Sequence, residues 1–272
     1  MTGRTPQLSH GRVPFTLSHP AAVLPLLRRA PLAASGLVAG SMAPDVPFFV
    51  ESVIPGSFTV GRLAHRPWAV PTLDVAIAAG LVGVWHGLLR EPLIALVPGE
   101  WGDRAEAATA LSKRRRTARD AAWFAASAAI GAASHVGWDA FTHHGRTGVR
   151  LLPALERRVL GVPVYSQLQY GTSLLGLAVL GTAGARELRR TPPVPRRLEP
   201  GEQTRRRVAG VVAAATAVGA AERVARAART ASGRIPPGAA VSALCFGGGA
   251  GAAVVAAGYA LATRVRRTSR RG

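Results

Sequence analysis

The stretch from Ala239 to Thr263 reads AAVSALCFGGGAGAAVVAAGYALAT and contains no aspartate, glutamate, lysine or arginine. A helix needs about 20 predominantly apolar residues to cross the hydrocarbon core of a bilayer. This stretch is long enough to cross the core at a tilt. It therefore predicts a membrane-spanning helix, and the basic residues Arg264 to Arg271 predict a tail at the membrane surface.

Further apolar stretches lie upstream and alternate with basic segments. Leu73 to Leu89 is apolar enough to span, and a charged Arg-Glu-Pro sequence follows it. Gly171 to Ala185 and Val208 to Ala221 are shorter, so their helices would extend into flanks whose arginines reach the interface. Asp120 to His144 mixes small, aromatic and polar residues at helical spacing, which is typical of a helix inside a bundle. These patterns predict an all-α fold, a multi-pass transmembrane helix bundle with about five or six membrane helices.

The overall composition agrees with this prediction. The 272 residues include 34 lysines and arginines and 14 acidic residues, for a net charge of +20, yet the mean hydropathy is positive. Charged and apolar residues must therefore lie in separate stretches of the sequence. We considered nucleic-acid binding and set it aside, because no aromatic-plus-basic strand pattern or helix-turn-helix signature accompanies the charge. The basic clusters flank apolar runs, so we expect membrane lipids, and no nucleic acid, as partners.

The chain divides by composition into four segments. They are a disordered leader (1–13), a membrane domain with histidine and aspartate motifs (14–185), a basic proline-rich loop (186–207), and C-terminal membrane helices with a basic tail (208–272). Cytoplasmic loops carry an excess of lysine and arginine. We therefore predict a multi-pass protein of the cell membrane whose C-terminus is cytoplasmic.

One polar motif lies inside the predicted bundle. His135, Asp139 and His143 stand at positions i, i+4 and i+8, so a helix places all three on one face. Imidazole and carboxylate groups at this spacing can bind one metal ion. Ionisable groups in apolar surroundings are costly and are usually functional or paired. Metal ligation and a purely hydrogen-bonded network both fit the pattern.

Other candidates are distant in sequence. Asp45 ends the turn Gly40-Ser41-Met42-Ala43-Pro44-Asp45, where proline would present the carboxylate rigidly. His19 precedes a proline, and His65 lies in a predicted loop, where a solvated side chain is the simpler alternative. Tyr165 and Gln169 precede an apolar stretch and suit contact with a headgroup or substrate, although interfacial anchoring by tyrosine is the plainer explanation.

Three stretches together resemble a known family of bacterial membrane proteins, domain-of-unknown-function family 4184. They are PFTLSHPAAVLP at 14–25, GSMAPD at 40–45 and SHVGWDAFTH at 134–143. The resemblance covers roughly residues 14–185. The family pattern is in turn similar to that of membrane-bound proteins assigned as metal-dependent hydrolases, with a remote likeness to zinc-dependent phospholipase C.

This resemblance implies a site. The implied metal ligands are His19, Asp45, His135, Asp139 and His143. The ion would be divalent, with zinc as the example that the likeness offers. The residues themselves, apart from the resemblance, suggest Asp45 or Asp139 as the catalytic base that activates water. His65, Tyr165 and Gln169 are the predicted substrate contacts.

Two functions follow from the sequence. The first is a membrane-embedded, metal-dependent hydrolase acting on a lipid or another amphiphile. The alternative is a non-enzymatic membrane protein, a transporter or scaffold, in which buried histidines and aspartates hold helices together by hydrogen bonds.

Overall fold

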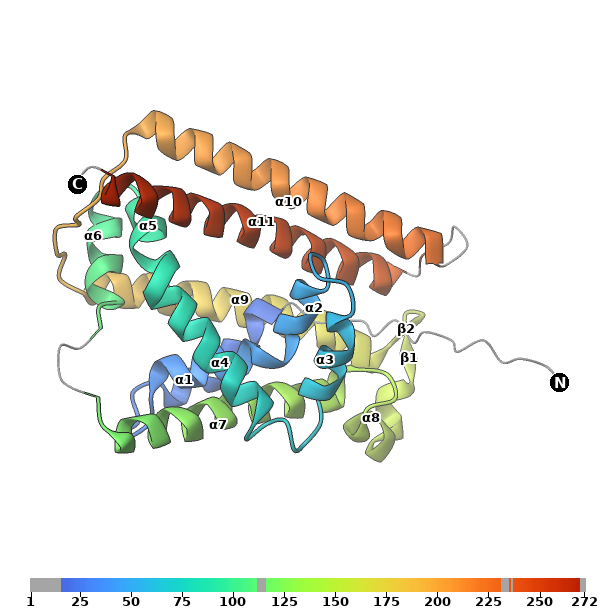
Figure 1. The fold of residues 1–272 in the computed structure, drawn as a ribbon. Helices are drawn as coiled ribbons and strands as arrows, with labels where there is room; N and C mark the ends of the chain where they lie inside the picture. Colours follow the sequence, from blue (N-terminus) through green and yellow to red (C-terminus); the bar gives the residue numbers. More distant parts are fainter. Residues whose placement is uncertain (1–15, 112–115, 231–234, 236, 270–272) are drawn as a thin grey trace.

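The chain folds into helices with a single short hairpin among the described residues (Figure 1). The structure is a computed structural model and describes residues 16–111, 116–230, 235 and 237–269; the predicted leader lies outside them. The N-terminal elements are η1 (Thr16–Leu26), α1 (Ala34–Met42), η2 (Ala43–Asp45), α2 (Val46–Val50) and α3 (Ser57–Ala64). The central ones are α4 (Leu73–Val84), η3 (Trp85–Leu89), α5 (Arg90–Ala95), α6 (Gly99–Ala108) and α7 (Ala118–Thr142). The last are α8 (Thr147–Leu151), η4 (Pro153–Glu156), β1 (Arg158–Val159), β2 (Val162–Pro163), α9 (Val164–Arg190), α10 (Glu202–Thr230) and α11 (Pro237–Thr268).

Three helices in the described part of the chain are long and apolar enough to span a membrane. They cover Leu73–Ala95, Glu202–Arg229 and Gly238–Thr268. These are fewer than the five or six membrane helices that the sequence predicts. Helices α7 and α9 are long, but their buried polar side chains lower their hydropathy. The apolar segment 31–50 forms only short helices, because Pro44 and Pro47 break it up.

The first candidate span passes through the Arg-Glu-Pro sequence without ending. Pro92 has no N–H group, and its ring crowds the preceding turn of a regular helix. A π-helical turn, η3, precedes α5 and widens the helix just before Pro92. Such wide turns occur as single-turn bulges inside helices. Residues 73–95 therefore form one continuous helical rod.

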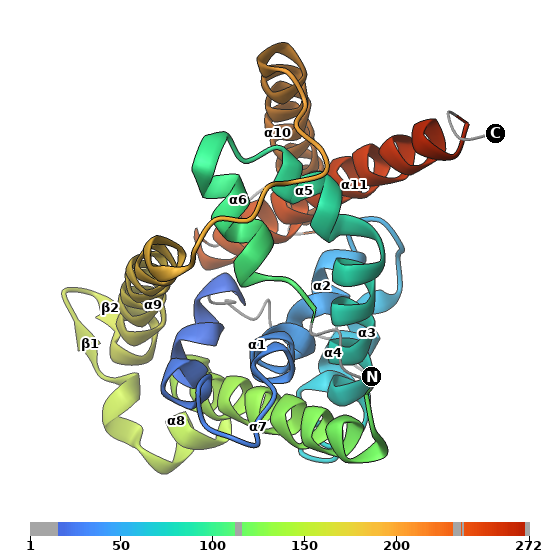
Figure 2. The same cartoon turned by 90° about the vertical axis from the view of Figure 1, so that its left-hand side faces the viewer.

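Helices α10 and α11 form an antiparallel pair along one side of the molecule (Figures 1 and 2). Small residues let the two backbones approach closely, and a Cβ added to Gly219 would lie 2.3 Å from the carbonyl oxygen of Gly247. Arginines of both helices tie this pair to the rest of the bundle. Arg223 donates to the carbonyl oxygen of Phe48 at 2.8 Å, and Arg267 pairs with Glu91 at 2.7 Å.

Helices α1 and α7 pack with their backbones nearly touching. A Cβ on Gly40 would come 2.1 Å from the carbonyl oxygen of Ala128, and one on Gly131 would come 2.3 Å from that of Leu37. Real side-chain atoms do not fit at these distances, so glycine is required at both contacts. This close packing brings the C-terminal end of α1, and the η2 turn after it, against the polar face of α7.

Two glycines of α7 give a matched test of this packing. We expect Gly131→Ala to force α1 and α7 apart and to destabilise the protein by about 1–3 kcal/mol, the usual cost of overpacking. A Cβ added to Gly137 would meet no neighbouring atom within 4 Å, so Gly137→Ala is expected to stabilise the helix by up to about 1 kcal/mol. Thermal unfolding in detergent measures both. Equal unfolding temperatures for the two variants would contradict the packing argument.

Candidate metal centre

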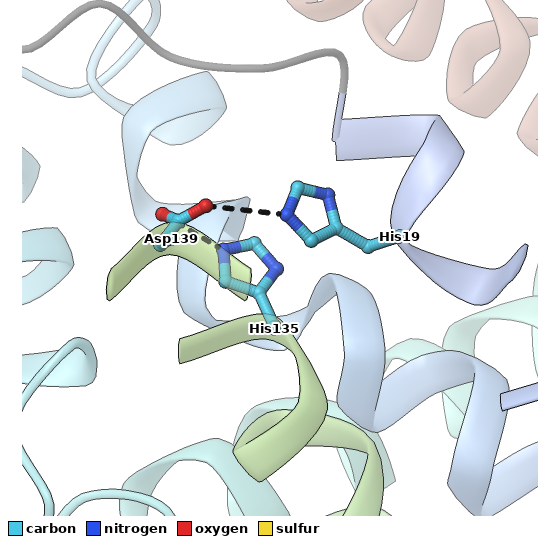
Figure 3. A group of neighbouring side chains, drawn as sticks. All are labelled: His19, His135 and Asp139. Carbon is cyan, nitrogen blue, oxygen red and sulfur yellow. Dashed lines mark hydrogen bonds and ion pairs between the residues drawn. The ribbon is translucent and has the colours of Figure 1, made fainter. Parts of the chain in front are cut away.

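Helix α7 carries the central pair of side chains, as the sequence predicted. The helix begins with a capping box formed by Thr117 and Asp120 and runs to Thr142. His135 and Asp139 lie one turn apart on its buried face, at 0% and 2% exposure. Figure 3 shows both side chains beside His19, which comes from η1.

Asp45 reaches the same place from the η2 turn. Its carboxylate is fully buried, and its Oδ2 accepts a hydrogen bond of 2.5 Å from the hydroxyl of Thr16. Its Oδ1 has no hydrogen-bond partner within the described part of the chain. The prolines that shorten the neighbouring helices thus hold one oxygen of Asp45 toward the histidines.

Four donor atoms, contributed by Asp45, His65, His135 and Asp139, form a closed ring. His65 Nε2 lies 3.5 Å from both Asp45 Oδ1 and Asp139 Oδ2. His135 Nε2 lies 3.5 Å from Asp45 Oδ1 and 3.6 Å from Asp139 Oδ2. His65, assigned from sequence to substrate contact, stands here among the candidate ligands and is 5% exposed.

Both histidines of this ring are oriented in the way typical of metal ligands. The Nδ1 of His135 lies 2.8 Å from the carbonyl oxygen of Ser41, and the Nδ1 of His65 lies 2.8 Å from that of Gly61. A carbonyl oxygen only accepts, so each Nδ1 carries the proton. In a neutral imidazole, each Nε2 then presents its lone pair to the ring. Metal-binding histidines usually donate their other N–H to such a partner.

The remaining predicted residues lie at the other oxygen of Asp139. Its Oδ1 is 3.4 Å from His19 Nε2 and 3.5 Å from His143 Nδ1. His143 directly follows α7, and both of its ring nitrogens have protein partners. Its Nδ1 lies 3.2 Å from the carbonyl oxygen of Asp139, and its Nε2 lies 3.3 Å from the buried Gln169 amide nitrogen. The Nδ1 of His19 has no hydrogen-bond partner among the residues that the structure describes.

Tyr165 lies at the edge of this region. It is buried, and its ring centroid stands 5.9 Å from that of His144. The predicted residues therefore come together from η1, η2, α7, α9 and the residue that follows α3. Tyr165 is the one whose observed contacts do not reach the ring.

Without an ion, the carboxylates and imidazoles of the ring shift one another's pKa values toward the charged forms. Burial raises the pKa of Asp45, but His135 and His65 outweigh it, and the pKa falls below its usual value. Burial lowers the pKa of His65, but Asp139 and Asp45 raise it to about 9. The pKa of His135 is raised well above its usual value by the same two carboxylates, against burial. One divalent ion with two neutral imidazoles would supply the same charge.

The edge lengths of the ring match the spacing of ligands around one ion better than they match the length of hydrogen bonds. Hydrogen bonds between these atom types are typically about 2.7–3.2 Å long, whereas the four edges of the ring measure 3.5–3.6 Å. Donors placed about 2.0–2.2 Å from a tetrahedral ion are about 3.4 Å apart. Among the described residues, His135 Nε2 and Asp45 Oδ1 also lack any hydrogen-bond partner. Donor atoms of two overlapping groups lie close enough together to hold a metal ion; the groups are Asp45, His65 and His135, and His19, His135 and Asp139.

Sequence reasoning missed Asp74 at the start of α4. This side chain is fully buried, neither of its oxygens has a hydrogen-bond partner in the described chain, and it lies within electrostatic range of His65 and His135. The available signal was that Asp74 is the only acid in the apolar run Leu73 to Leu89. An ionisable residue in such a run is a candidate functional group.

Residues 13–261 match a known protein family, described as a domain of unknown function (DUF4184). The chain belongs to this family. The match to DUF4184 extends past the segment 14–185 that the motifs cover, and it includes α10 and most of α11. The C-terminal helix pair is therefore part of the DUF4184 domain. No curated protein and no solved structure was found to match the chain.

Thr16 provides a test of how the site is supported. We expect Thr16→Val to weaken metal binding by about 10- to 100-fold, because the hydroxyl that fixes Asp45 Oδ2 is removed while the ligands remain. Thr59→Val, at an exposed position of α3, is the control and should leave the affinity unchanged. Metal titration followed by calorimetry gives both constants. Equal metal affinities in the two variants would show that the Thr16 hydroxyl does not support the site.

Proposed function

We propose that this DUF4184 protein is a membrane-embedded, metal-dependent hydrolase that acts on an ester of a lipid or another amphiphile. The ring formed by Asp45, His65, His135 and Asp139 carries the proposal, because its spacing is that of ligands around one ion. Two imidazoles and two carboxylates suit zinc or a similar divalent ion. When bound with a coordination position open to water beside the protein ligands, such an ion would make that water acidic enough to attack an ester near neutral pH and would polarise the ester oxygen.

The geometry favours ligand roles for both aspartates. Asp45 directs one oxygen to the histidines and the other to Thr16, and Asp139 directs one oxygen into the ring. Neither carboxylate is then left to act as the base. We assign proton transfer to His19, whose Nε2 faces Asp139 Oδ1 and whose Nδ1 is unpartnered. His143 holds Asp139 in place, and Gln169 positions His143.

The surroundings of the ring support an amphiphilic substrate. Three membrane-capable helices belong to the same domain, so a substrate dissolved in lipid has direct access to the protein. Gln169 and Tyr165 lie on α9 next to the cluster, and Gln169 Oε1 has no partner in the described chain. We retain these two residues as the substrate contacts.

Replacing His19 tests its role in catalysis separately from metal binding. We expect His19→Asn to keep its bound metal while turnover falls by about 10²- to 10⁴-fold, the usual contribution of a general acid or base. The assay follows release of fatty acid or phosphorylated headgroup from a panel of lipids in detergent, with zinc-loaded protein. His144→Asn, at the exposed neighbouring histidine, is the control. Unchanged turnover in His19→Asn would remove that residue from catalysis, and absence of hydrolysis in the wild type would contradict the proposed function.

Complete burial favours a second candidate function. No residue of the cluster is more than 6% exposed, and four protein ligands around an ion are typical of structural sites. In this alternative the ion or the charged side chains join η2, α3 and α7 in a non-enzymatic scaffold. A protein that binds metal and is stabilised by it, yet hydrolyses none of the lipids, would support this candidate.

A further inference from the structure

The segment between α7 and α9 exposes large apolar side chains. Leu160 is 97% exposed and Leu151 is 71% exposed. Leu152, Val159 and Val162 are also exposed. We name residues 146–163 the arginine hairpin; it contains α8, η4, β1 and β2. An apolar cluster on a short loop is unusual in water and marks a contact surface.

The turn of the hairpin holds its most exposed leucine outward. Val159 pairs with Val162, and both intervening residues have positive φ, 52° at Leu160 and 76° at Gly161. Such turns prefer asparagine, aspartate or glycine at the first of these positions. Gln167 secures the turn by donating to the carbonyl oxygens of Val159 and Val162 at 2.7 and 3.0 Å. Leu160 therefore occupies a turn position that leucine does not favour, and its side chain does not pack into the core.

The same segment is rich in positive charge. The hairpin contains four arginines and one acid, which are Arg146, Arg150, Arg157, Arg158 and Glu156. Arg150 and Arg157 are exposed, and within the described chain neither is paired with a carboxylate. Exposed leucine and valine beside unpaired arginine is the combination that binds an anionic lipid surface.

The position of the hairpin fits a membrane surface. Figure 1 shows it at the end of the molecule where α9 begins, the same end at which α10 finishes and α11 starts. If α10 and α11 cross the bilayer, this end lies at the level of the lipid headgroups. The hairpin also joins two residues of the cluster, since His143 precedes it and Gln169 follows it.

We propose that the arginine hairpin inserts its apolar tip, centred on Leu160, into the headgroup region of an anionic bilayer, with Arg150 and Arg157 on the lipid phosphates. Lipid contact there would place headgroups beside α9 and the cluster. The inference rests on the membrane insertion that is part of the proposed function, and it does not depend on the metal.

Site-specific fluorescence in nanodiscs tests this proposal. Leu160→Cys is introduced in a Cys245→Ala background, because Cys245 is the only cysteine. The cysteine is labelled with an environment-sensitive dye, and the full chain is placed in phosphatidylcholine discs with or without phosphatidylglycerol and with doxyl-labelled quencher lipid. Val218→Cys, 68% exposed on α10, is the reference for membrane insertion itself.

We expect quenching at Leu160 in discs that contain phosphatidylglycerol, and less without it. Arg150→Gln with Arg157→Gln should lower the ratio of inserted to withdrawn hairpin by about 25-fold, since each arginine near an anionic surface contributes a factor of about five. Quenching at Val218 without quenching at Leu160 would overturn the proposal and leave membrane insertion intact. Absence of quenching at Leu160 and at Val218 would overturn the hairpin proposal and the proposed membrane insertion together. Equal quenching at Leu160 in the two lipid mixtures would overturn the assignment to anionic lipid.

Discussion

Replacing Asp139 by asparagine is expected to weaken metal binding by more than about 100-fold and to abolish any hydrolysis. Loss of a partner that only orients a ligand costs about 10- to 100-fold, and Asp139 is itself a ligand of the proposed ion. Its Oδ2 lies 3.5 Å from His65 Nε2 and 3.6 Å from His135 Nε2, so it contributes two of the four edges of the ring. The amide of asparagine has nearly the same size but lacks the negative charge that the ion requires.

The measurement is a zinc titration of wild type and Asp139→Asn after removal of metal. Asp103→Asn is the matched control, because Asp103 pairs with Arg196 on another segment, away from the cluster. The control should bind zinc as the wild type does. Wild-type affinity in Asp139→Asn would mean that the ring is not a metal site.

The second large effect is on stability. Removing metal with a chelator is expected to lower the unfolding temperature of the wild type by about 5–10 °C. An ion present at about 100 times its dissociation constant stabilises the folded state by about 2.7 kcal/mol, and each kcal/mol corresponds to roughly 2–4 °C in a protein of this size. An ion in the ring would join η2, α7 and the residue that follows α3, so its loss would separate segments far apart in the chain.

The variant His135→Ala shows whether a metal ion or hydrogen bonds alone stabilise the cluster of histidines and aspartates. If an ion joins these segments, this variant should unfold at a lower temperature than the wild type and should no longer respond to chelator. If hydrogen bonds alone hold the cluster, His135→Ala destabilises the protein while chelator has no effect on the wild type. His144→Ala, with the exposed neighbouring histidine replaced, should behave as the wild type in both measurements.

Local sequence patterns predicted the parts of the site but not the role of every member. His135 and Asp139 were found because a helix places positions i and i+4 on one face, and Asp45 because prolines fix its turn. His65 belongs to none of these local patterns, and its convergence with Asp45 and His135 depends on tertiary packing. A loop histidine has no local signature of such packing, so its place among the candidate ligands could not be predicted.

The described residues contain fewer membrane-capable helices than the sequence predicted, for a physical reason. Helices α7 and α9 are long enough to cross a bilayer, but their buried serine, glutamine, histidine and aspartate side chains serve the interior of the bundle. Hydropathy falls where a helix packs a polar cluster, whatever its length. The helical fold itself followed from composition, while the close contact of α1 with α7 depends on Gly40 and Gly131 and required the structure.

X-ray absorption at the metal edge of the zinc-loaded protein tests the central claim most directly. We predict about one zinc per chain, bound only by nitrogen and oxygen at about 2.0–2.2 Å, with the outer-shell scattering of two imidazoles from His65 and His135. A protein that retains no zinc after loading, or one whose zinc lacks imidazole scattering, would contradict it.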